Sequence, residues 1–234
     1  MLYGSLFSGI GGMDLGFDRA GMKCAWQVEI DPYARRVLEK HWPKVPKHDD
    51  IKTFTGAQHV DVIAGGFPCQ DVSSSGKRAG LDGERSGLFY EFSRVISELG
   101  PRFVVMENVA DLVVRGLPRV LGELASLGYD AEWHCIPAAD FGVPQGRDRI
   151  WIVANANSGR FAASEKRNSA REVISKRPDD DGLVEAQRRA RDVAPRECRV
   201  ANGVSKGMDR VRCLGNSVVP QVAEWIARRI VQSI

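Results

Sequence analysis

A cysteine that could act as a nucleophile lies in the stretch GGFPCQDVSSSGKRAG, Gly65–Gly80. Cys69 comes shortly after an apolar run, directly behind Pro68, and glycine and serine residues follow it. A structural cysteine usually lies inside a core as a small hydrophobe, but these flanking residues would make a poor core. Lys77 and Arg78 could supply the positive charge that lowers the pKa of a thiol. We therefore predict a presented, reactive thiol at the end of a strand; the alternative is a buried, inert cysteine.

Two further motifs could supply a carboxylate and cations to the same reaction. VVMENV, Val104–Val109, reads as an apolar strand that ends in Glu107, and carboxylates are rarely buried unless they are used or paired. In QGRDRIWIVA, Gln145–Ala154, Arg147 and Arg149 occupy alternate positions entering a strand, so they share a face and could reach polar oxygens together. Surface arginines without a role are the alternative for this second motif.

A glycine-rich turn, FSGIGGMDLGF at Phe7–Phe17, follows the first expected strand and leads into the first helix. Glycine at such a turn lets the backbone approach a ligand at the edge where open α/β sheets bind nucleotides. Asp14 replaces the third glycine of the dinucleotide fingerprint, which argues against a nicotinamide enzyme. Glu29 ends the second strand, where a carboxylate can accept hydrogen bonds from a ribose. A purely structural turn is the alternative.

The elements that must position these residues alternate between strands and helices. Such alternation predicts an α/β fold with a mainly parallel sheet and helices on both faces. The expected strands are Leu2–Phe7, Cys24–Ile30, Val60–Ala64, Phe103–Met106, Tyr129–Ile136 and Arg149–Ala154. The expected helices are Gly12–Ala20, Pro32–His41, Leu88–Leu99, Leu117–Leu127 and Ser217–Ile234, the last with Asn216 or Ser217 as its N-cap.

The chain divides into a body, an arginine-rich segment and a return to order. We expect residues 1–154 to form the catalytic and cofactor-binding domain, 155–199 a small loop-rich region, and 200–234 a C-terminal segment that returns to the catalytic domain. Residues 1–159 hold 17 Lys and Arg against 20 Asp and Glu, whereas residues 160–212 hold 14 against 9. A basic segment on a near-neutral body favours a partner with a phosphate backbone; a solvated, arginine-rich loop is the alternative.

Composition excludes several classes of protein. Five scattered cysteines without a C-x-x-C pair argue against a disulfide framework and against a zinc site. No apolar run reaches the length of a membrane span, and the N-terminus shows no secretory pattern. We expect a cytoplasmic protein that binds neither metal nor membrane.

Together, and in this order, FSGIGG, GGFPCQ, ENV, QGRDR and GNSVVP resemble the characteristic blocks of the DNA (cytosine-5-)-methyltransferases. The resemblance covers residues 1–154 and roughly 199–234, and it points to a member of the phage or restriction-modification type. It implies a Rossmann-like, S-adenosylmethionine-dependent methyltransferase fold. It also implies a methyl transfer to carbon 5 of a cytosine that is flipped out of double-stranded DNA.

The resemblance assigns roles to the chemical residues. Cys69 would attack carbon 6 of the base, Glu107 would bind the ring edge, and Arg149 with Arg147 would hold the base carbonyl or a phosphate. The expected substrate-binding residues are Gln70, Ser73, Ser75, Asn108 and Gln145. The residues expected to bind S-adenosyl-L-methionine are Phe7, Ser8, Gly9, Ile10, Gly11, Gly12, Glu29, Ile30, Asp50, Ile51, Pro68, Leu88, Asn216 and Val218.

One departure from the family concerns target recognition. Residues 155–199 offer only about 45 positions where relatives carry a large recognition segment, so sequence readout would be short, relaxed or assisted by another chain. An RNA cytosine-5 methyltransferase of the same lineage and a catalytically lapsed DNA-binding relative are the alternatives. A monomeric state and a cognate restriction enzyme as genetic partner both stay open.

Overall fold

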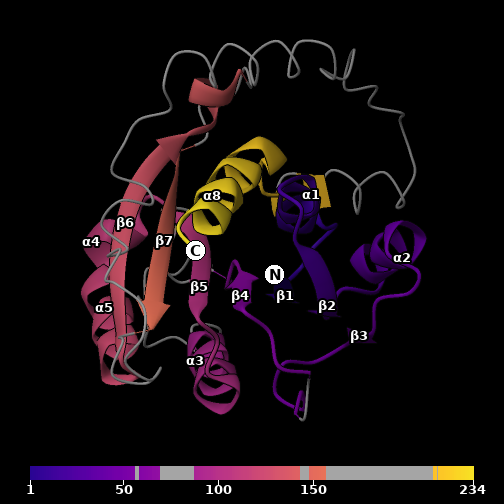
Figure 1. Cartoon of the computed structure of the whole chain (residues 1–234), viewed down its shortest axis with the longest axis horizontal. Coiled ribbons are helices and arrows are strands. Elements are labelled where there is room, and N and C mark those ends of the chain that lie inside the picture. The colour runs from indigo at the N-terminus through magenta and orange to yellow at the C-terminus, as the bar shows by residue number, and fades with distance from the viewer. Residues whose placement is uncertain (56–57, 69–86, 143–147, 157–212, 215) are drawn as a thin grey trace, which may run out of the picture.

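The computed structural model describes residues 1–55, 58–68, 87–142, 148–156, 213–214 and 216–234. Seven strands in this part of the chain form one sheet in the order β3-β2-β1-β4-β5-β7-β6 (Figure 1). The strands are β1 (Leu2–Leu6), β2 (Lys23–Val28), β3 (Lys47–His48), β4 (Val62–Gly65), β5 (Phe103–Val109), β6 (Tyr129–Pro137) and β7 (Asp148–Ala156). The helices are α1 (Gly12–Arg19), α2 (Pro32–His41), α3 (Gly87–Leu99), α4 (Leu112–Arg115), α5 (Leu117–Ser126), the 3-10 helix η2 (Ala138–Phe141) and α8 (Pro220–Gln232).

The first five strands are parallel, as the alternation of strands and helices predicts. β7 inserts antiparallel between β5 and β6, which the sequence did not reveal. Only residues 138–147 separate β6 from β7, and parallel strands need a crossover of about a dozen residues or more. The prediction of a mainly parallel sheet with helices on both faces is confirmed.

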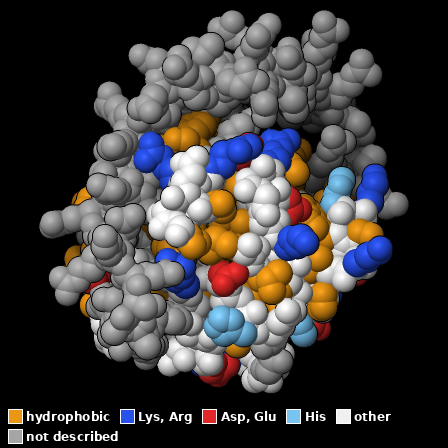
Figure 2. Space-filling model, in the orientation of Figure 1, with side chains coloured by type: hydrophobic (Ala, Val, Ile, Leu, Met, Phe, Trp, Pro, Cys, Tyr) orange, Lys and Arg blue, Asp and Glu red, His pale blue; other side chains and the backbone are white. Residues whose placement is uncertain are grey.

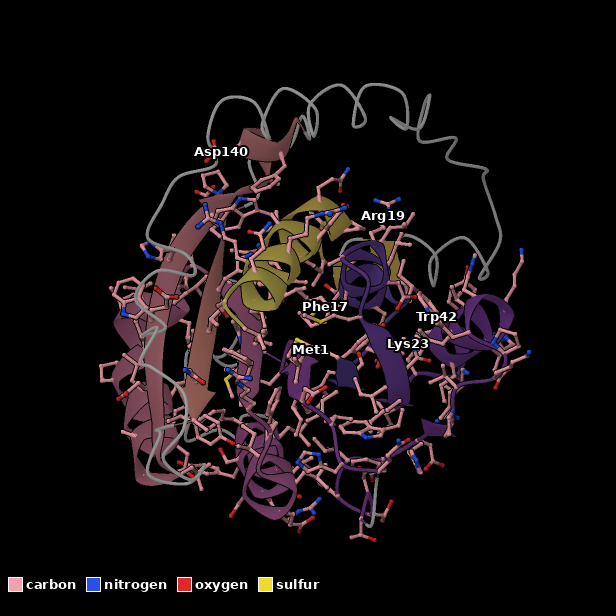
Figure 3. All side chains as sticks on the ribbon, in the orientation of Figure 1. Met1, Phe17, Arg19, Lys23, Trp42 and Asp140 are labelled. Atoms are coloured by element: carbon pink, nitrogen blue, oxygen red, sulfur yellow. The ribbon has the colours of Figure 1, made fainter. Side chains whose placement is uncertain are left out.

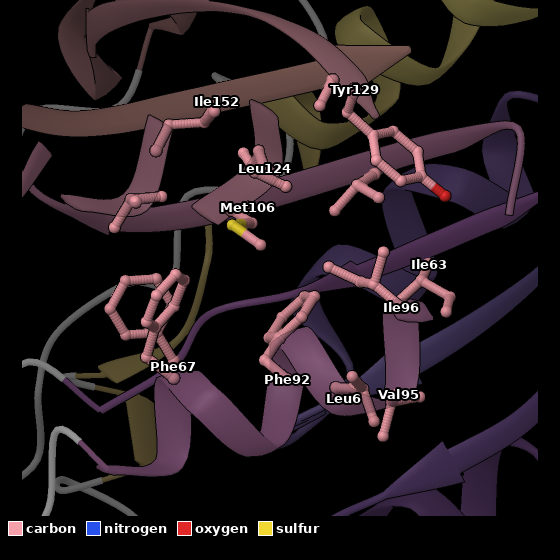
Figure 4. Packing of buried hydrophobic residues seen from close by; sticks show 14 of the residues in the cluster. Leu6, Ile63, Phe67, Phe92, Val95, Ile96, Met106, Leu124, Tyr129 and Ile152 are labelled. Carbon is pink, nitrogen blue, oxygen red and sulfur yellow. The ribbon is translucent and has the colours of Figure 1, made fainter. Parts of the chain in front are cut away.

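Two apolar cores lie on the two faces of the sheet. On one face, α3 and α5 pack against alternating strand residues such as Ile63, Met106 and Ile152 (Figure 4). On the other face, α1 and α8 pack against Val62, Val105 and their neighbours. β4, most of β5 and the middle of β7 are covered on both sides, so they read as continuous apolar runs.

The last helix differs from its expected form. α8 begins at Pro220, its N-cap is Val219, and no side chain caps it, so the expectation of Asn216 or Ser217 as N-cap is wrong. Proline is favoured at the first helical position because its fixed φ suits the helix and its missing N–H is not needed there. Ser217 and Val218 are thereby left ahead of the helix, where both lie against Gly12.

Candidate functional site

The crevice at the edge of the sheet follows from the strand order. From β1 the chain moves outward through β2 and β3, and from β4 it moves outward the other way through β5. Ligands of open α/β sheets bind where the strand order reverses, beyond the carboxyl ends of the strands. Here that point lies between the carboxyl ends of β1 and β4, which are followed by Phe7–Gly12 and by Gly66–Pro68.

The turn after β1 adopts backbone conformations that require glycine. Gly9 and Gly11 have φ of 56° and 84°, in the left-handed region, and Phe7 also has a positive φ of 54°. A Cβ on Gly9 would meet nothing within 4 Å, so this part of the turn faces open space. A Cβ on Gly12 would lie 2.5 Å from the carbonyl oxygen of Val218. The motif GNSVVP therefore packs directly against the glycine turn. The resemblance assigns residues of both motifs to binding of S-adenosylmethionine.

Glu29 joins the turn after β1 to the turn after β2. Its carboxylate accepts hydrogen bonds from the backbone N–H groups of Gly9 and Asp31, each at 2.7 Å. Ile30 beside it is 68% exposed, which leaves an apolar surface next to the open turn. Each carboxylate oxygen of Glu29 has a second lone pair, so it can still accept a hydrogen bond from a ribose hydroxyl.

The other residues expected to bind the cofactor differ in their burial. Ser8 is buried, and its hydroxyl donates to the carbonyl oxygen of Ser5. Ile51 is only 4% exposed and packs in the core, whereas the Asp50 carboxylate accepts a hydrogen bond from the N–H of Lys52. The residues that are half-buried or exposed are Ile10, Pro68, Leu88, Asn216 and Val218.

A carboxylate and a guanidinium meet where β5 and β7 lie side by side. Glu107 and Arg149 form an ion pair of 2.9 Å between Oε1 and Nε. Their side chains are 12% and 26% exposed, and both line a pocket with Trp151, Ser217 and Val218. The two sequence motifs that carry them are thus brought together by the antiparallel pairing of β5 with β7.

The segment that leads to Cys69 runs past the Glu107 carboxylate. A Cβ on Gly66 would lie 2.7 Å from Glu107 Oε2, so the backbone at Gly66 passes close to this carboxylate. Asn108 is buried, and its side-chain amide donates to the carbonyl oxygen of Phe67 at 3.1 Å. Its Oδ1 accepts from the N–H of Val109 at 2.9 Å. The structure therefore places Asn108 as a tie between β5 and the chain two residues before Cys69, rather than as a side chain exposed to a substrate.

Several expected site residues lie outside the described residues, so their placement is not part of this geometry. They are Cys69, Gln70, Ser73, Ser75, Gln145 and Arg147, together with almost all of the region 155–199. Among the described residues, no group of three or more His, Cys, Asp or Glu side chains could hold a metal ion. Within the same residues no helix is long and apolar enough to cross a membrane.

A buried polar cluster beneath the glycine turn was missed by the sequence analysis. Asp14 is 1% exposed and accepts hydrogen bonds from Ser5 Oγ at 3.0 Å and Gln27 Nε2 at 2.8 Å. Burial raises the pKa of Asp14 to about 6, although these two hydrogen bonds act in the opposite direction. Burial and the nearby Asp14 also raise the pKa of the Cys24 thiol, so Cys24 is unsuited to nucleophilic chemistry. A glutamine within an apolar strand was the signal that could have revealed this cluster.

The seven-stranded, mostly parallel sheet with helices on both faces is the Rossmann-like fold of the S-adenosylmethionine-dependent methyltransferases. The methyltransferase EhMeth of Entamoeba histolytica has the same fold, with a TM-score of 0.69 at 12% identity over 99% of this chain and 98% of that one. Residues 1–197 match the family described as C-5 cytosine-specific DNA methylase. The chain belongs to this family, and the resemblance stated from its motifs is confirmed.

Relatives with similar sequences support the same family. The Type II methyltransferase M.AquIA of Picosynechococcus is 36% identical over 72% of this chain and 79% of its own length. The Type II methyltransferase M1.HphI of Haemophilus parahaemolyticus is 37% identical over 70% of this chain. The chain spans 48% of M1.HphI and between 39% and 44% of six further relatives.

Proposed function

We propose that this chain transfers a methyl group to carbon 5 of cytosine in DNA, through a transient bond between Cys69 and the base. The observation that carries the proposal is the Glu107–Arg149 ion pair, which lines a pocket and lies against Gly66, three residues before Cys69. Membership of the C-5 cytosine-specific DNA methylase family supports the same reaction.

The chemistry requires the target base to leave the stack, because carbon 5 cannot be reached within a duplex. The Cys69 thiolate forms a bond to carbon 6, and the electron pair of the 5,6 double bond becomes available at carbon 5. Carbon 5 would then take the methyl group, as the bond from this methyl to the sulfonium sulfur breaks and its electron pair stays on sulfur. Loss of the carbon-5 proton to a base regenerates the 5,6 double bond and expels the Cys69 thiolate.

Glu107 would stabilise the base during this sequence. At 12% exposure its carboxyl group lies in a site where electrostatic interactions are stronger than in water. A hydrogen bond to ring nitrogen 3 or the exocyclic amino group would offset the charge that develops on the ring. Arg149 fixes the orientation of the Glu107 carboxylate through the ion pair, and Arg147 would assist at the base carbonyl or a phosphate.

The residues around the crevice fit S-adenosylmethionine. Gly9 presents open space, and Glu29 has an acceptor lone pair to spare beside the exposed Ile30. Bound there, the cofactor supplies a methyl group on a positively charged sulfur. The backbone of Gly9–Gly12 would hold its methionine end, Glu29 its ribose, and Asp50 and Ile51 the adenine. Ser217 and Val218 close this side of the crevice against Gly12.

The partner we propose is double-stranded DNA, with residues 155–199 as a reduced recognition region and the cytoplasm as the location. Lys and Arg side chains lie along the upper border of the described surface in Figure 2. In the sequence, residues 160–212 hold an excess of Lys and Arg, which favours a partner with a phosphate backbone. The Type II relatives favour a role in a restriction-modification system.

The decisive experiment measures transfer of labelled methyl from S-adenosylmethionine to unmethylated duplex DNA and, in parallel, to RNA. Cys69→Ala should abolish transfer, whereas the matched variant Cys135→Ala, at an exposed cysteine on β6, should retain it. Duplex DNA with 5-fluorocytosine should form a denaturant-resistant complex with the wild-type protein, because fluorine cannot leave as a proton does.

Three results would contradict the proposal. Turnover retained in Cys69→Ala would refute the covalent mechanism. Transfer to RNA without transfer to DNA would move the chain to the RNA-modifying branch, and cofactor binding without transfer to either would indicate a lapsed enzyme.

A further inference from the structure

Arg94 of α3 reaches across to the segment that follows β3. Its Nη2 donates to the carbonyl oxygen of Ile51 at 2.7 Å, and its Nη1 donates to that of Phe54 at 3.2 Å. One guanidinium therefore binds two carbonyl oxygens of a single turn, about 40 residues away in the sequence. The planar fork of arginine suits such a two-point contact, which a lysine ammonium cannot reproduce.

The backbone hydrogen bonds within the turn at Asp50–Phe54 are weak. Its two backbone hydrogen bonds, Thr53 N–H to Asp50 and Phe54 N–H to Ile51, are both 3.3 Å long. Such distances lie beyond the usual 2.7–3.2 Å, so these bonds are weak. The side chains of Ile51 and Phe54 are buried and fix one side of the turn, and Arg94 fixes its carbonyl side.

Two carboxylates orient the guanidinium. Glu91 accepts from Arg94 Nε and Glu98 from Nη1, each at 2.8 Å. Charge-assisted hydrogen bonds of this kind are shorter and stronger than neutral ones. The Arg94 side chain is 29% exposed, so it is held by a network rather than left in solvent as a free surface arginine.

The helix that carries Arg94 also contacts the other side of the crevice. Phe92 stacks on Phe7 with ring centroids 6.2 Å apart, and Leu88 is the second residue of the same helix. α3 starts at Gly87, directly after the residues that contain Cys69. α3 therefore contacts both the turn after β1, through Phe92 and Phe7, and the turn at Asp50–Phe54, through Arg94.

We propose that Arg94 is a positioning residue for cofactor binding, which holds the Asp50–Phe54 turn in the conformation that receives adenine. The inference rests on the proposed function, because that function places adenine at Asp50 and Ile51. Arg94 itself does not touch the cofactor; it acts through the two carbonyl groups. Its loss should weaken binding of the adenine end and leave the chemical step intact.

The test compares Arg94→Met, Arg94→Lys and the control Arg102→Met by calorimetric titration with S-adenosylhomocysteine. Arg102 lies at the opposite end of β5, where its guanidinium stacks over Phe103. We expect Arg94→Met to raise the Kd about tenfold, in line with the loss of charged hydrogen bonds. Arg94→Lys should fall between Arg94→Met and the wild type, and the control should match the wild type. The KM for S-adenosylmethionine should rise similarly, with kcat and the KM for DNA changed by less than about twofold.

A second ligand separates positioning of adenine from general distortion. 5′-Methylthioadenosine carries the adenosine but lacks the amino-acid end, so its Kd should rise by the same factor as that of S-adenosylhomocysteine. An unchanged Kd for both ligands in Arg94→Met would overturn the inference, as would a loss confined to S-adenosylhomocysteine. If Arg94→Met does not fold, Arg94→Lys decides by the same criteria. Failure of the wild-type protein to bind either ligand would instead refute the proposed function.

Discussion

The two ends of the crevice are built on different principles. At the β1–β2 end, the polar groups are bonded to one another within the protein: Glu29 to two backbone N–H groups, and Asp14 to Ser5 and Gln27. At the β5–β7 end, Glu107 and Arg149 form one ion pair that borders a pocket. The first end is fixed by many local contacts, whereas the second presents charge to an incoming group.

This difference suggests a division of labour. A turn held by its own backbone and by buried partners is preorganised to bind a ligand without rearrangement, which lowers the cost of binding. A carboxylate at low exposure next to a cation is suited to stabilise charge that develops during a reaction. Substitutions at the two ends should therefore separate binding from chemistry.

The largest effect should come from Glu107→Gln, which tests the β5–β7 end. The amide keeps the shape of the side chain but removes the negative charge, so single-turnover methyl transfer should fall about 10²- to 10³-fold. The Kd for S-adenosylhomocysteine should stay within about twofold of the wild type. An equal loss in cofactor affinity would contradict the separation of binding from chemistry, because Glu107 would then contribute to both.

Asp14→Asn tests the buried cluster under the glycine turn. The pKa of Asp14 is raised from 3.8 to about 6, so the folded state holds this proton more tightly than the unfolded state. The resulting stabilisation is complete below about pH 4 and is lost as the pH rises through 6. The free energy of unfolding of the wild type should therefore fall, relative to Asp14→Asn, by about 2 kcal/mol between pH 4 and pH 7.

Urea unfolding at several pH values measures this difference. Glu39→Gln, at an exposed carboxylate on α2, serves as the control and should follow the wild-type curve. A constant difference between Asp14→Asn and the wild type from pH 4 to pH 7 would show that Asp14 does not titrate with a raised pKa.

The smallest effect should come from Trp42→Phe. Trp42 lies between α1 and α2 (Figure 3), and its indole N–H donates to Asp18 Oδ2 at 2.6 Å. Its ring packs against Gly11 so closely that a Cβ there would lie 2.4 Å from the ring. Loss of the hydrogen bond should cost about 1 kcal/mol of stability and raise the Kd for S-adenosylhomocysteine a few-fold.

The control for Trp42→Phe is Trp133→Phe, at a partly exposed tryptophan on the edge strand β6. Thermal unfolding and calorimetric titration should leave the control at wild-type values. Identical behaviour of the two variants would mean that Trp42 does not support the glycine turn.

The sequence alone predicted most of the elements, because apolar runs and turn residues are local signals. The helix at Pro32–His41 is observed with those bounds, and the other expected strands and helices differ from the observed ones by three residues or fewer at each end. The short β3 and the helix α4 were missed, since two and four residues carry too little pattern. The N-cap expected for the last helix was wrong because Pro220 sets its start.

By itself the sequence determined the family and the residue types of the site, since motifs such as ENV and FSGIGG are runs of neighbouring residues. Only the tertiary structure decided which of them meet. The pairing of β5 with β7 joins Glu107 to Arg149, and the approach of Val218 to Gly12 brings the last motif to the first. The contacts of Asn108, Arg94 and Asp14 likewise join residues that are distant in sequence. Such contacts depend on strand order and helix packing, which local sequence patterns do not encode.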